Sequence, residues 1–305
     1  MAAPEVSIVE VGPRDGFQAI SRFIPTPTKV AMIARLHAAG VRRMEATAFV
    51  SEKAVPQMAD AAEILYATSD MTGLDVQVLT PNVRYAERAV AAGARHIAFV
   101  LSVSEKHNMN NVRRMPSDSA NEYATVTRAI GAQIDMRLNV ATAFDCPFDG
   151  EVAPERTLAL LEQLVAPRAG VEIALCDTTG RVTPDRVRAL FERARNHFPM
   201  VARWAFHGHD TYGLGVANVL AAYDAGVRVF DASFAGLGGC PFAPGATGNV
   251  ATEDVVWTLD RMGVRTGIDL ATLLCVARDG AELPEACAGG RVRNAIFAAQ
   301  TRELE

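Results

Sequence analysis

The chain has 305 residues, of which 50% are hydrophobic and 21% are charged, and its formal net charge is −5. This composition is typical of a soluble globular protein, and a weak negative charge without a basic stripe argues against a nucleic-acid partner. Five cysteines without a CxxC pair do not suggest a disulfide framework, so we expect a reducing, cytoplasmic location. The sequence shows no secretory-signal pattern and no apolar run long enough for a membrane span, so we expect no membrane partner.

Short apolar, β-branched runs alternate with segments of helical periodicity along the first 265 residues. The predicted strands are, in chain order, Val6–Val11, Arg42–Ala46, Leu74–Leu79, His96–Leu101, Asp135–Ala141, Glu172–Leu175, Ala202–Phe206 and Val227–Ser233. The predicted helices cover residues 27–39, 55–67, 82–92, 117–131, 153–165, 183–197, 214–225 and 251–262. Glycines directly after several helical segments, and a capping residue before proline in Thr183-Pro184, support these boundaries.

This order of elements predicts an α/β fold in which eight β-then-α units form a parallel sheet. Eight strands are the number that closes a (β/α)8 TIM barrel, although a doubly wound open sheet has the same alternation. We expect a single domain over residues 1–305, with the barrel at about 5–265. The segment at about 267–305 is expected to add one or two short helices and a charged tail.

Two histidines follow the seventh predicted strand, in Phe206-His207-Gly208-His209-Asp210. Side chains at positions i and i+2 of an extended segment point the same way, so His207 and His209 can present two imidazoles to one point. The C-terminal ends of the strands are where barrel active sites are built. The pattern indicates a metal site, although two polar residues ending a strand are the simpler interpretation.

The loop after the first predicted strand, Val11-Gly12-Pro13-Arg14-Asp15-Gly16, offers the carboxylate of Asp15 at the same face of the barrel. Proline, aspartate and glycine are also typical of a simple turn. Taken alone, this motif favours a turn over a site.

A glycine-rich loop follows the eighth predicted strand and spans residues 235–249. Long loops at this position are usually lids or binding loops. Cys240 within it is either a reactive thiol or a small buried residue. Asn249 at its end is either a helix cap or an oxygen donor to a metal.

Closure of an eight-stranded barrel places strand 8 between strands 7 and 1, whereas an open sheet would separate them. Closure therefore gathers Asp15, His207, His209 and Asn249 at one mouth. Two imidazoles, one carboxylate and one amide favour Mg²⁺ or Mn²⁺, with Zn²⁺ or Co²⁺ as competent substitutes. At other strand ends lie Glu45 and Asp177, and Glu45 is also an obvious ion-pair partner for Arg14.

These motifs resemble the 3-hydroxy-3-methylglutaryl-CoA lyase family, within a wider group of metal-dependent barrels that includes isopropylmalate and citramalate synthases. The resemblance covers roughly residues 5–265 and rests on Val11–Gly16, Glu45-Ala46-Thr47, Val55–Asp60, His207–Gly213, the Gly236–Asn249 loop with Cys240 before Pro241, and Asp254. It implies a divalent-metal-dependent lyase that cleaves 3-hydroxy-3-methylglutaryl-CoA into acetoacetate and acetyl-CoA, and it implies a homodimer formed through C-terminal helices.

The resemblance also implies roles for individual residues. Arg14 would stabilise negative charge on the thioester oxygen, and Cys240 would protonate the acetyl-CoA enolate. Glu45 and Asp177 would support the site, while Gln18 and Asp254 would be substrate-binding positions. The base that removes the hydroxyl proton is left open between Asp177 and Asp15.

The chain departs from the family pattern at residues 17–21, 106–114 and 145–149, all expected near the mouth. These departures keep two further functions in view, a lyase for a different 3-hydroxy-3-methyl acyl-CoA or hydroxy acid, and a Claisen-type acyl-CoA synthase. The Cys240 loop and the lack of a long C-terminal regulatory domain argue against the synthase. A non-enzymatic barrel scaffold would predict an incomplete metal site, whereas all four ligand positions are filled.

Overall fold

Eight parallel strands close into a barrel in the computed structural model, which describes residues 5–168, 170–239 and 248–302. Strand β1 pairs with both β2 and β10, which closes the sheet. The barrel strands are β1 Ser7–Glu10, β2 Arg43–Ala48, β3 Asp75–Thr80, β4 His96–Ser102, β5 Asp135–Ala141, β8 Glu172–Asp177, β9 Arg203–Gly208 and β10 Val229–Ala232. The predicted (β/α)8 barrel is confirmed, because each of the eight predicted strands overlaps one of these.

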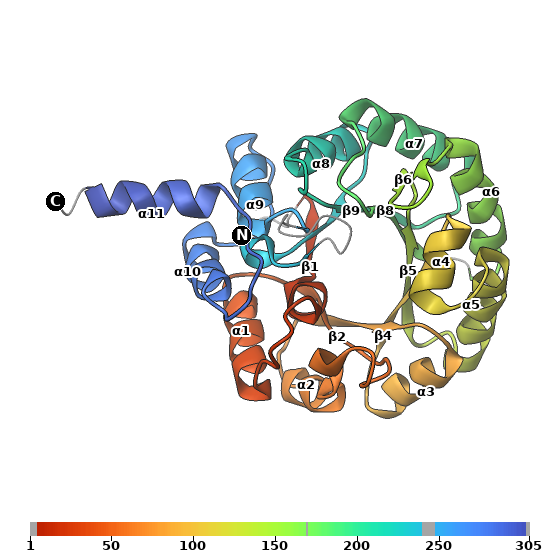
Figure 1. Cartoon of the computed structure of the whole chain (residues 1–305), viewed down its shortest axis with the longest axis horizontal. Helices are drawn as coiled ribbons and strands as arrows, with labels where there is room; N and C mark the ends of the chain where they lie inside the picture. The colour runs from red at the N-terminus through yellow and green to blue at the C-terminus, as the bar shows by residue number, and fades with distance from the viewer. Residues whose placement is uncertain (1–4, 169, 240–247, 303–305) are drawn as a thin grey trace.

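Helices surround the barrel, and two further helices extend it at the C-terminal end (Figure 1). The helices are α1 Thr26–Ala38, α2 Ala61–Thr68, α3 Val83–Ala91, α4 Glu105–Val112, α5 Pro116–Ile130, α6 Pro154–Val165, α7 Pro184–His197, α8 Gly215–Asp224, α9 Thr252–Arg261, α10 Leu270–Ala281 and α11 Val292–Arg302. Short turns are the π-helix η1 Gly12–Gly16 and the 3₁₀ helices η2 Pro56–Met58 and η3 Phe234–Gly236. In Figure 1, α11 projects away from the barrel beside α9 and α10.

The structure differs from the predicted helices in two places. The segment predicted as one helix over 55–67 is divided into η2 and α2, and Asp60 lies at the break. Its carboxylate accepts from Lys29 Nζ at 2.9 Å and from Thr26 Oγ1 at 2.9 Å, which anchors the break to α1. Helix α4 was not predicted because its polar sequence lacks an apolar stripe; it begins after Ser104, whose side chain accepts from the His107 backbone.

A hairpin of β6 Asp145–Cys146 and β7 Gly150–Glu151 follows β5 and was also not predicted. It lies in the loop between β5 and α6, on the side where the strands end. Strands this short give no period-2 pattern that a sequence can reveal.

Two apolar layers build the protein. The larger one lies between the strands and the surrounding helices. The smaller one fills the barrel interior with small side chains at alternate positions of β1, β8, β9 and β10, and comprises Val9, Val11, Ala174, Cys176, Ala205 and Val229.

A buried arginine interrupts the apolar filling of the barrel. Arg137 on β5 is 1% exposed and donates from Nη2 to both oxygens of Asp231, at 2.8 and 2.6 Å. Its Nη1 lies 3.3 Å from Glu172, which in turn contacts Arg43 at 2.8 Å. Ionic contacts therefore run through the interior, and a buried arginine requires such partners.

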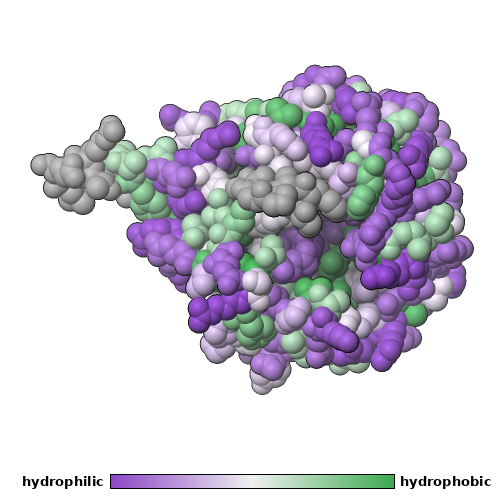
Figure 2. Space-filling view, viewed as in Figure 1, coloured by the Kyte–Doolittle hydropathy of each residue, from purple (hydrophilic) through white to green (hydrophobic). Residues whose placement is uncertain are grey.

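The surface seen along the barrel axis is hollowed at the centre of the barrel, with hydrophilic side chains around much of the rim (Figure 2). Among the residues described, no helix is long and apolar enough to cross a membrane.

Candidate active site

The four predicted metal ligands come from three places that barrel closure brings together. Asp15 lies in η1 directly after β1, and His207 and His209 lie at the end of β9. Asn249 forms an isolated antiparallel bridge with His209, and the flanking backbone bonds join Asp210 N to Gly248 O at 2.7 Å. The chain segment after the glycine-rich loop is thus hydrogen-bonded to the end of β9, which places Asn249 beside the histidines.

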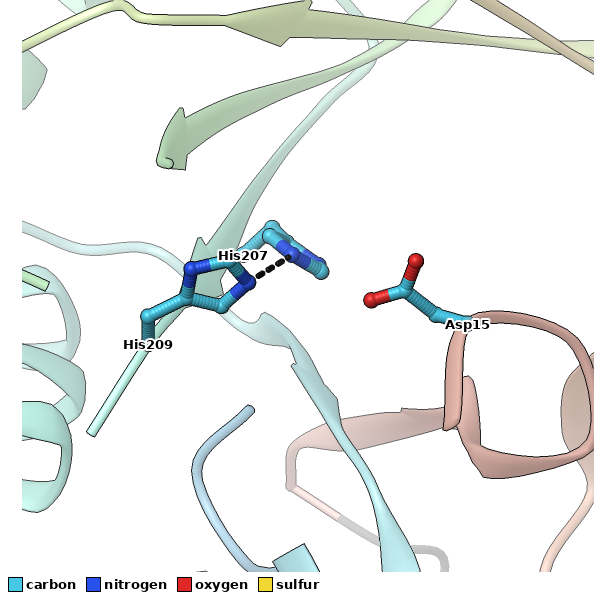
Figure 3. Close-up of side chains that lie close together, drawn as sticks. All are labelled: Asp15, His207 and His209. Atoms are coloured by element: carbon cyan, nitrogen blue, oxygen red, sulfur yellow. Dashed lines mark hydrogen bonds between the residues drawn. The ribbon is translucent and has the colours of Figure 1, made fainter. Parts of the chain in front are cut away.

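Asp15, His207 and His209 form a compact cluster (Figure 3). One ligand atom from each residue lies within 4.8 Å of the other two. The two Nε2 atoms of the histidines are 3.3 Å apart, and the Asp15 carboxylate points toward them. Three potential ligands therefore converge on one point.

The second nitrogen of each imidazole is already held. His207 Nδ1 lies 3.1 Å from Asp231 Oδ2, and His209 Nδ1 lies 2.8 Å from the carbonyl oxygen of Thr178. A carboxylate or a carbonyl at Nδ1 fixes the tautomer that carries its proton there. Both Nε2 atoms are thereby left as lone-pair donors facing the cluster.

Asn249 completes the set with an oxygen. Its Nδ2 donates to Asp15 Oδ2 at 2.8 Å and to the carbonyl of Leu237 at 3.0 Å. Its Oδ1 is buried and has no hydrogen-bond partner among the described residues. A buried amide oxygen without a partner is costly, and a cation would satisfy it.

Charges around Asp15 favour its ionised form. Burial alone would raise the pKa of its carboxyl, but the neighbouring Arg14 guanidinium and both histidines outweigh burial and hold the pKa at about 2. Burial, reinforced by nearby His207, lowers the pKa of His209 to about 4. At neutral pH the cluster therefore offers a carboxylate and at least one neutral imidazole, the forms that bind metals.

Arg14 and Glu45 form a buried ion pair beside the cluster. Arg14 also contacts Asp15 Oδ1 at 2.5 Å, and Gln18 donates to the same oxygen at 2.9 Å. Glu45 thus orients the guanidinium of Arg14. Arg14 and Gln18 thus contact Asp15 directly, and Glu45 reaches it through Arg14.

The donor set fits a divalent cation. Two imidazole nitrogens, one carboxylate oxygen and one unpartnered amide oxygen suit a hard-to-borderline ion. The hydrogen bonds at both Nδ1 atoms are the supporting contacts that metal-bound histidines commonly make.

Comparison with known proteins identifies the chain's relatives. The HMGL-like family model matches residues 5–279. The mouse mitochondrial hydroxymethylglutaryl-CoA lyase is 42% identical over 271 residues, which is 88% of this chain and 83% of the mouse protein. The chain belongs to the hydroxymethylglutaryl-CoA lyase family.

Solved structures of family members agree with the fold. The HMG-CoA lyase of Bacillus subtilis has a TM-score of 0.91 and 35% identity, covering 97% of this chain and 100% of that one. An HMG-CoA lyase from Acinetobacter baumannii, solved with coenzyme A and 3-methylmalate, has a TM-score of 0.85 and 36% identity, with 92% of each chain covered.

Two residues that the family resemblance suggested lie outside the cluster. Asp177 is in register with Gly208 and not with His207, so its side chain leaves the strand on the opposite face. Its Oδ1 accepts from Gly180 N at 3.0 Å. Asp254 accepts from the backbone nitrogens of Arg291 and Val292 and thereby caps α11. The structure gives both carboxylates a structural contact, and their suggested roles stay predictions.

Cys240 of the family's glycine-rich loop lies outside the described residues. Asp231 was not among the predicted site residues, although a single acid in the run Val229-Phe230-Asp231-Ala232 of a predicted strand is a signal for an inward-facing charge. The Thr178 carbonyl, which holds His209 Nδ1, was not predicted either, because side-chain patterns cannot reveal a backbone contact.

Proposed function

We propose that this chain is a divalent-metal-dependent carbon–carbon lyase that cleaves 3-hydroxy-3-methylglutaryl-CoA into acetoacetate and acetyl-CoA. The observation that carries the proposal is the convergence of Asp15, His207 and His209 beside the unpartnered oxygen of Asn249, in a chain of this family. The reaction is a retro-Claisen cleavage, in which a tertiary alcohol becomes a ketone and the thioester fragment leaves as an enolate.

The metal would be held by Asp15, by Nε2 of His207 and His209, and by Oδ1 of Asn249. Mg²⁺ or Mn²⁺ suits this oxygen-containing set best, and Zn²⁺ or Co²⁺ can replace them. When bound, the ion supplies a Lewis acid that polarises the substrate oxygens.

Arg14 is the residue proposed to stabilise the enolate. Its guanidinium is buried, remains charged at any accessible pH, and is oriented by Glu45. A fixed positive charge at the developing enolate oxygen is worth roughly 3 kcal/mol at the transition state. Glu45 acts through Arg14 and is therefore a positioning residue.

Proton transfers require a base for the hydroxyl group and an acid for the enolate carbon. Cys240 is proposed as the acid, on a loop whose described ends are joined by a bond from Gly248 N to Gly238 O at 3.3 Å. Of the two candidate bases, Asp15 lies within the histidine cluster, whereas Asp177 lies outside it. Asp177 has the more suitable pKa, which burial raises to about 7.

The test is a product assay with purified protein loaded with Mn²⁺ or Mg²⁺, following acetoacetate and acetyl-CoA. We expect metal-dependent turnover and a loss of about 100-fold or more in kcat for Cys240→Ala, the usual contribution of a general acid. Asp177→Asn then decides between the two candidate bases. If Asp177 is the base, this variant should lose about as much kcat as Cys240→Ala; if Asp15 is the base, the loss should be much smaller. Metal-binding protein without turnover would contradict the substrate assignment.

A second candidate, a lyase for a different 3-hydroxy acyl group, is favoured by one feature of the mouth. Lys106 and Asp149, both in segments that depart from the family pattern, form an ion pair at 2.6 Å, and Ser104 donates to the same Asp149 at 2.9 Å. A screen of hydroxyacyl-CoA esters and free hydroxy acids separates the two candidates.

We further propose that the chain forms a homodimer in a cytoplasmic compartment. The family resemblance supports the dimer, and five cysteines without a CxxC motif support the compartment, whereas the relatives are described as mitochondrial. Light scattering after gel filtration and cell fractionation test the two statements.

A further inference from the structure

Arg293, the second residue of α11, makes two directed contacts in a buried setting. Its Nη1 donates to Glu253 Oε1 of α9 at 3.0 Å, and its Nη2 donates to the carbonyl oxygen of Gly289 at 2.7 Å. The side chain of Arg293 is 8% exposed and that of Glu253 is 0% exposed. The planar guanidinium suits this geometry because it directs several donors in a fixed fork.

Both partners of Arg293 hold the same residue, Ala235 of η3. The other oxygen of Glu253 accepts from Ala235 N at 3.0 Å, while Gly289 N donates to Ala235 O at 2.8 Å. The backbone donor and the backbone acceptor of Ala235 are therefore each paired with a group that Arg293 contacts.

Ala235 needs this support because its backbone is left-handed, with φ 58° and ψ 12°. A residue with a Cβ atom adopts this region only where its surroundings impose it. The neighbouring residue, Phe234, is also tightly packed. Its ring lies against Gly280 of α10, where an added Cβ atom would be only 2.4 Å from the ring. The turn over residues 234–237 is thus shaped by the C-terminal segment.

The same turn orients Asn249. Two residues after Ala235, the Leu237 carbonyl accepts from Asn249 Nδ2 at 3.0 Å, and this nitrogen also donates to Asp15 Oδ2 at 2.8 Å. With Nδ2 fixed between two acceptors, the direction of the unpartnered Oδ1 is determined. A shift of the Leu237 carbonyl would rotate that oxygen.

We propose that Arg293 is a positioning residue for the metal site, acting through Glu253, Gly289 and the 234–237 turn to aim the Asn249 amide oxygen at the histidine cluster. The inference rests on the proposed function in so far as it takes Asn249 as a ligand. It assigns a role to the start of α11, the helix that otherwise projects from the barrel in Figure 1.

The experiment is a Mn²⁺ titration of metal-free, full-length protein, with free Mn²⁺ measured by electron paramagnetic resonance. Arg293→Met is expected to weaken Mn²⁺ binding about tenfold or more, the size of effect seen when groups behind a metal ligand are removed. Arg293→Lys keeps the charge beside Glu253 but lacks the second directed donor. Its Mn²⁺ affinity should therefore lie between that of wild type and that of Arg293→Met.

Arg261→Met is the matched control, because Arg261 lies at the exposed end of α9 and its loss removes the same charge and a similar volume. It should bind Mn²⁺ like wild type. In steady-state assays, Arg293→Met should lower kcat at fixed Mn²⁺ while KM for the acyl-CoA changes less than threefold. A purely structural role would lower the melting temperature without changing Mn²⁺ affinity measured well below it.

A folded Arg293→Met protein with wild-type Mn²⁺ affinity overturns the proposal. If that variant does not fold, unchanged affinity of Arg293→Lys overturns it instead. Wild-type protein that binds Mn²⁺ but does not cleave the substrate refutes only the proposed reaction, and the affinity comparison still tests Arg293. Wild-type protein that binds no Mn²⁺ refutes both.

Discussion

Replacing Asp231 by asparagine tests whether the interior charges support the metal site. The Asp231 carboxylate is 3% exposed, accepts two bonds from Arg137 and holds His207 Nδ1. Asparagine has nearly the same shape but exchanges one acceptor oxygen for an NH₂ donor. At least one of these contacts must then become a donor facing a donor.

Two magnitudes follow from this loss. Removing the partner that orients a metal-binding histidine typically weakens metal binding by about 10- to 100-fold, which corresponds to about 1.4–2.8 kcal/mol. Breaking a buried ion pair costs about 3–5 kcal/mol of folding stability. Because Glu172 still contacts Arg137 at 3.3 Å, we expect the lower end, about 3 kcal/mol.

The assays are a Mn²⁺ titration and urea unfolding of metal-free protein. Asp224→Asn is the control, since this acid is 57% exposed and pairs with Arg188 on the surface; its cost should be about 0.5 kcal/mol or less. Folded Asp231→Asn protein with wild-type Mn²⁺ affinity would refute the reasoning.

Three further predictions concern pH, a buried ion pair and metal removal. Burial raises the pKa of Asp177 to about 7, so the folded state keeps a proton that the unfolded state releases near pH 4. The free energy of unfolding should therefore fall as the pH rises from 4 to 7, by up to about 1 kcal/mol per pH unit. Asp177→Asn should flatten that slope in urea unfolding at pH 5 and 7, and an unchanged slope would contradict the assignment. Lys29→Met should cost about 3 kcal/mol by leaving the Asp60 carboxylate buried without a counter-charge. Lys29→Met combined with Asp60→Leu should recover part of this loss; equal losses in thermal melts would argue against a buried pair. Mn²⁺ at about 100 times its Kd should stabilise the protein by about 2.7 kcal/mol, and His209→Ala should abolish the shift in calorimetry; a shift that persists would place the ion elsewhere.

The sequence predicted the barrel well because its signals are local. Each strand is a short apolar run between helix caps and glycines, and the alternation of strands and helices determines the topology. Helix α4 and the β6–β7 hairpin were missed because a polar helix and two-residue strands leave no periodic pattern.

The sequence predicted the part of the site that depends on barrel closure, but not the contacts that depend on strand register. Closure alone brings Asp15, His207, His209 and Asn249 together, because it makes the first and last strands neighbours. Asp231 was missed since its role depends on the register between β9 and β10, which pairs it with His207. Asp254 shows the converse, since its motif matched the family while the structure reveals a contact that the motif did not suggest, the cap of α11.

The bridge between His209 and Asn249 has a consequence for biosynthesis. Asp15 leaves the ribosome long before His207 and His209, and Asn249 emerges only after all eight strands of the barrel have been made. Any nascent chain that ends before Asn249 lacks one of the four proposed ligands and the backbone bonds that hold it beside β9. The complete set of four proposed ligands therefore exists only once the whole barrel sequence has been synthesised, and an ion that needs all four binds after that point.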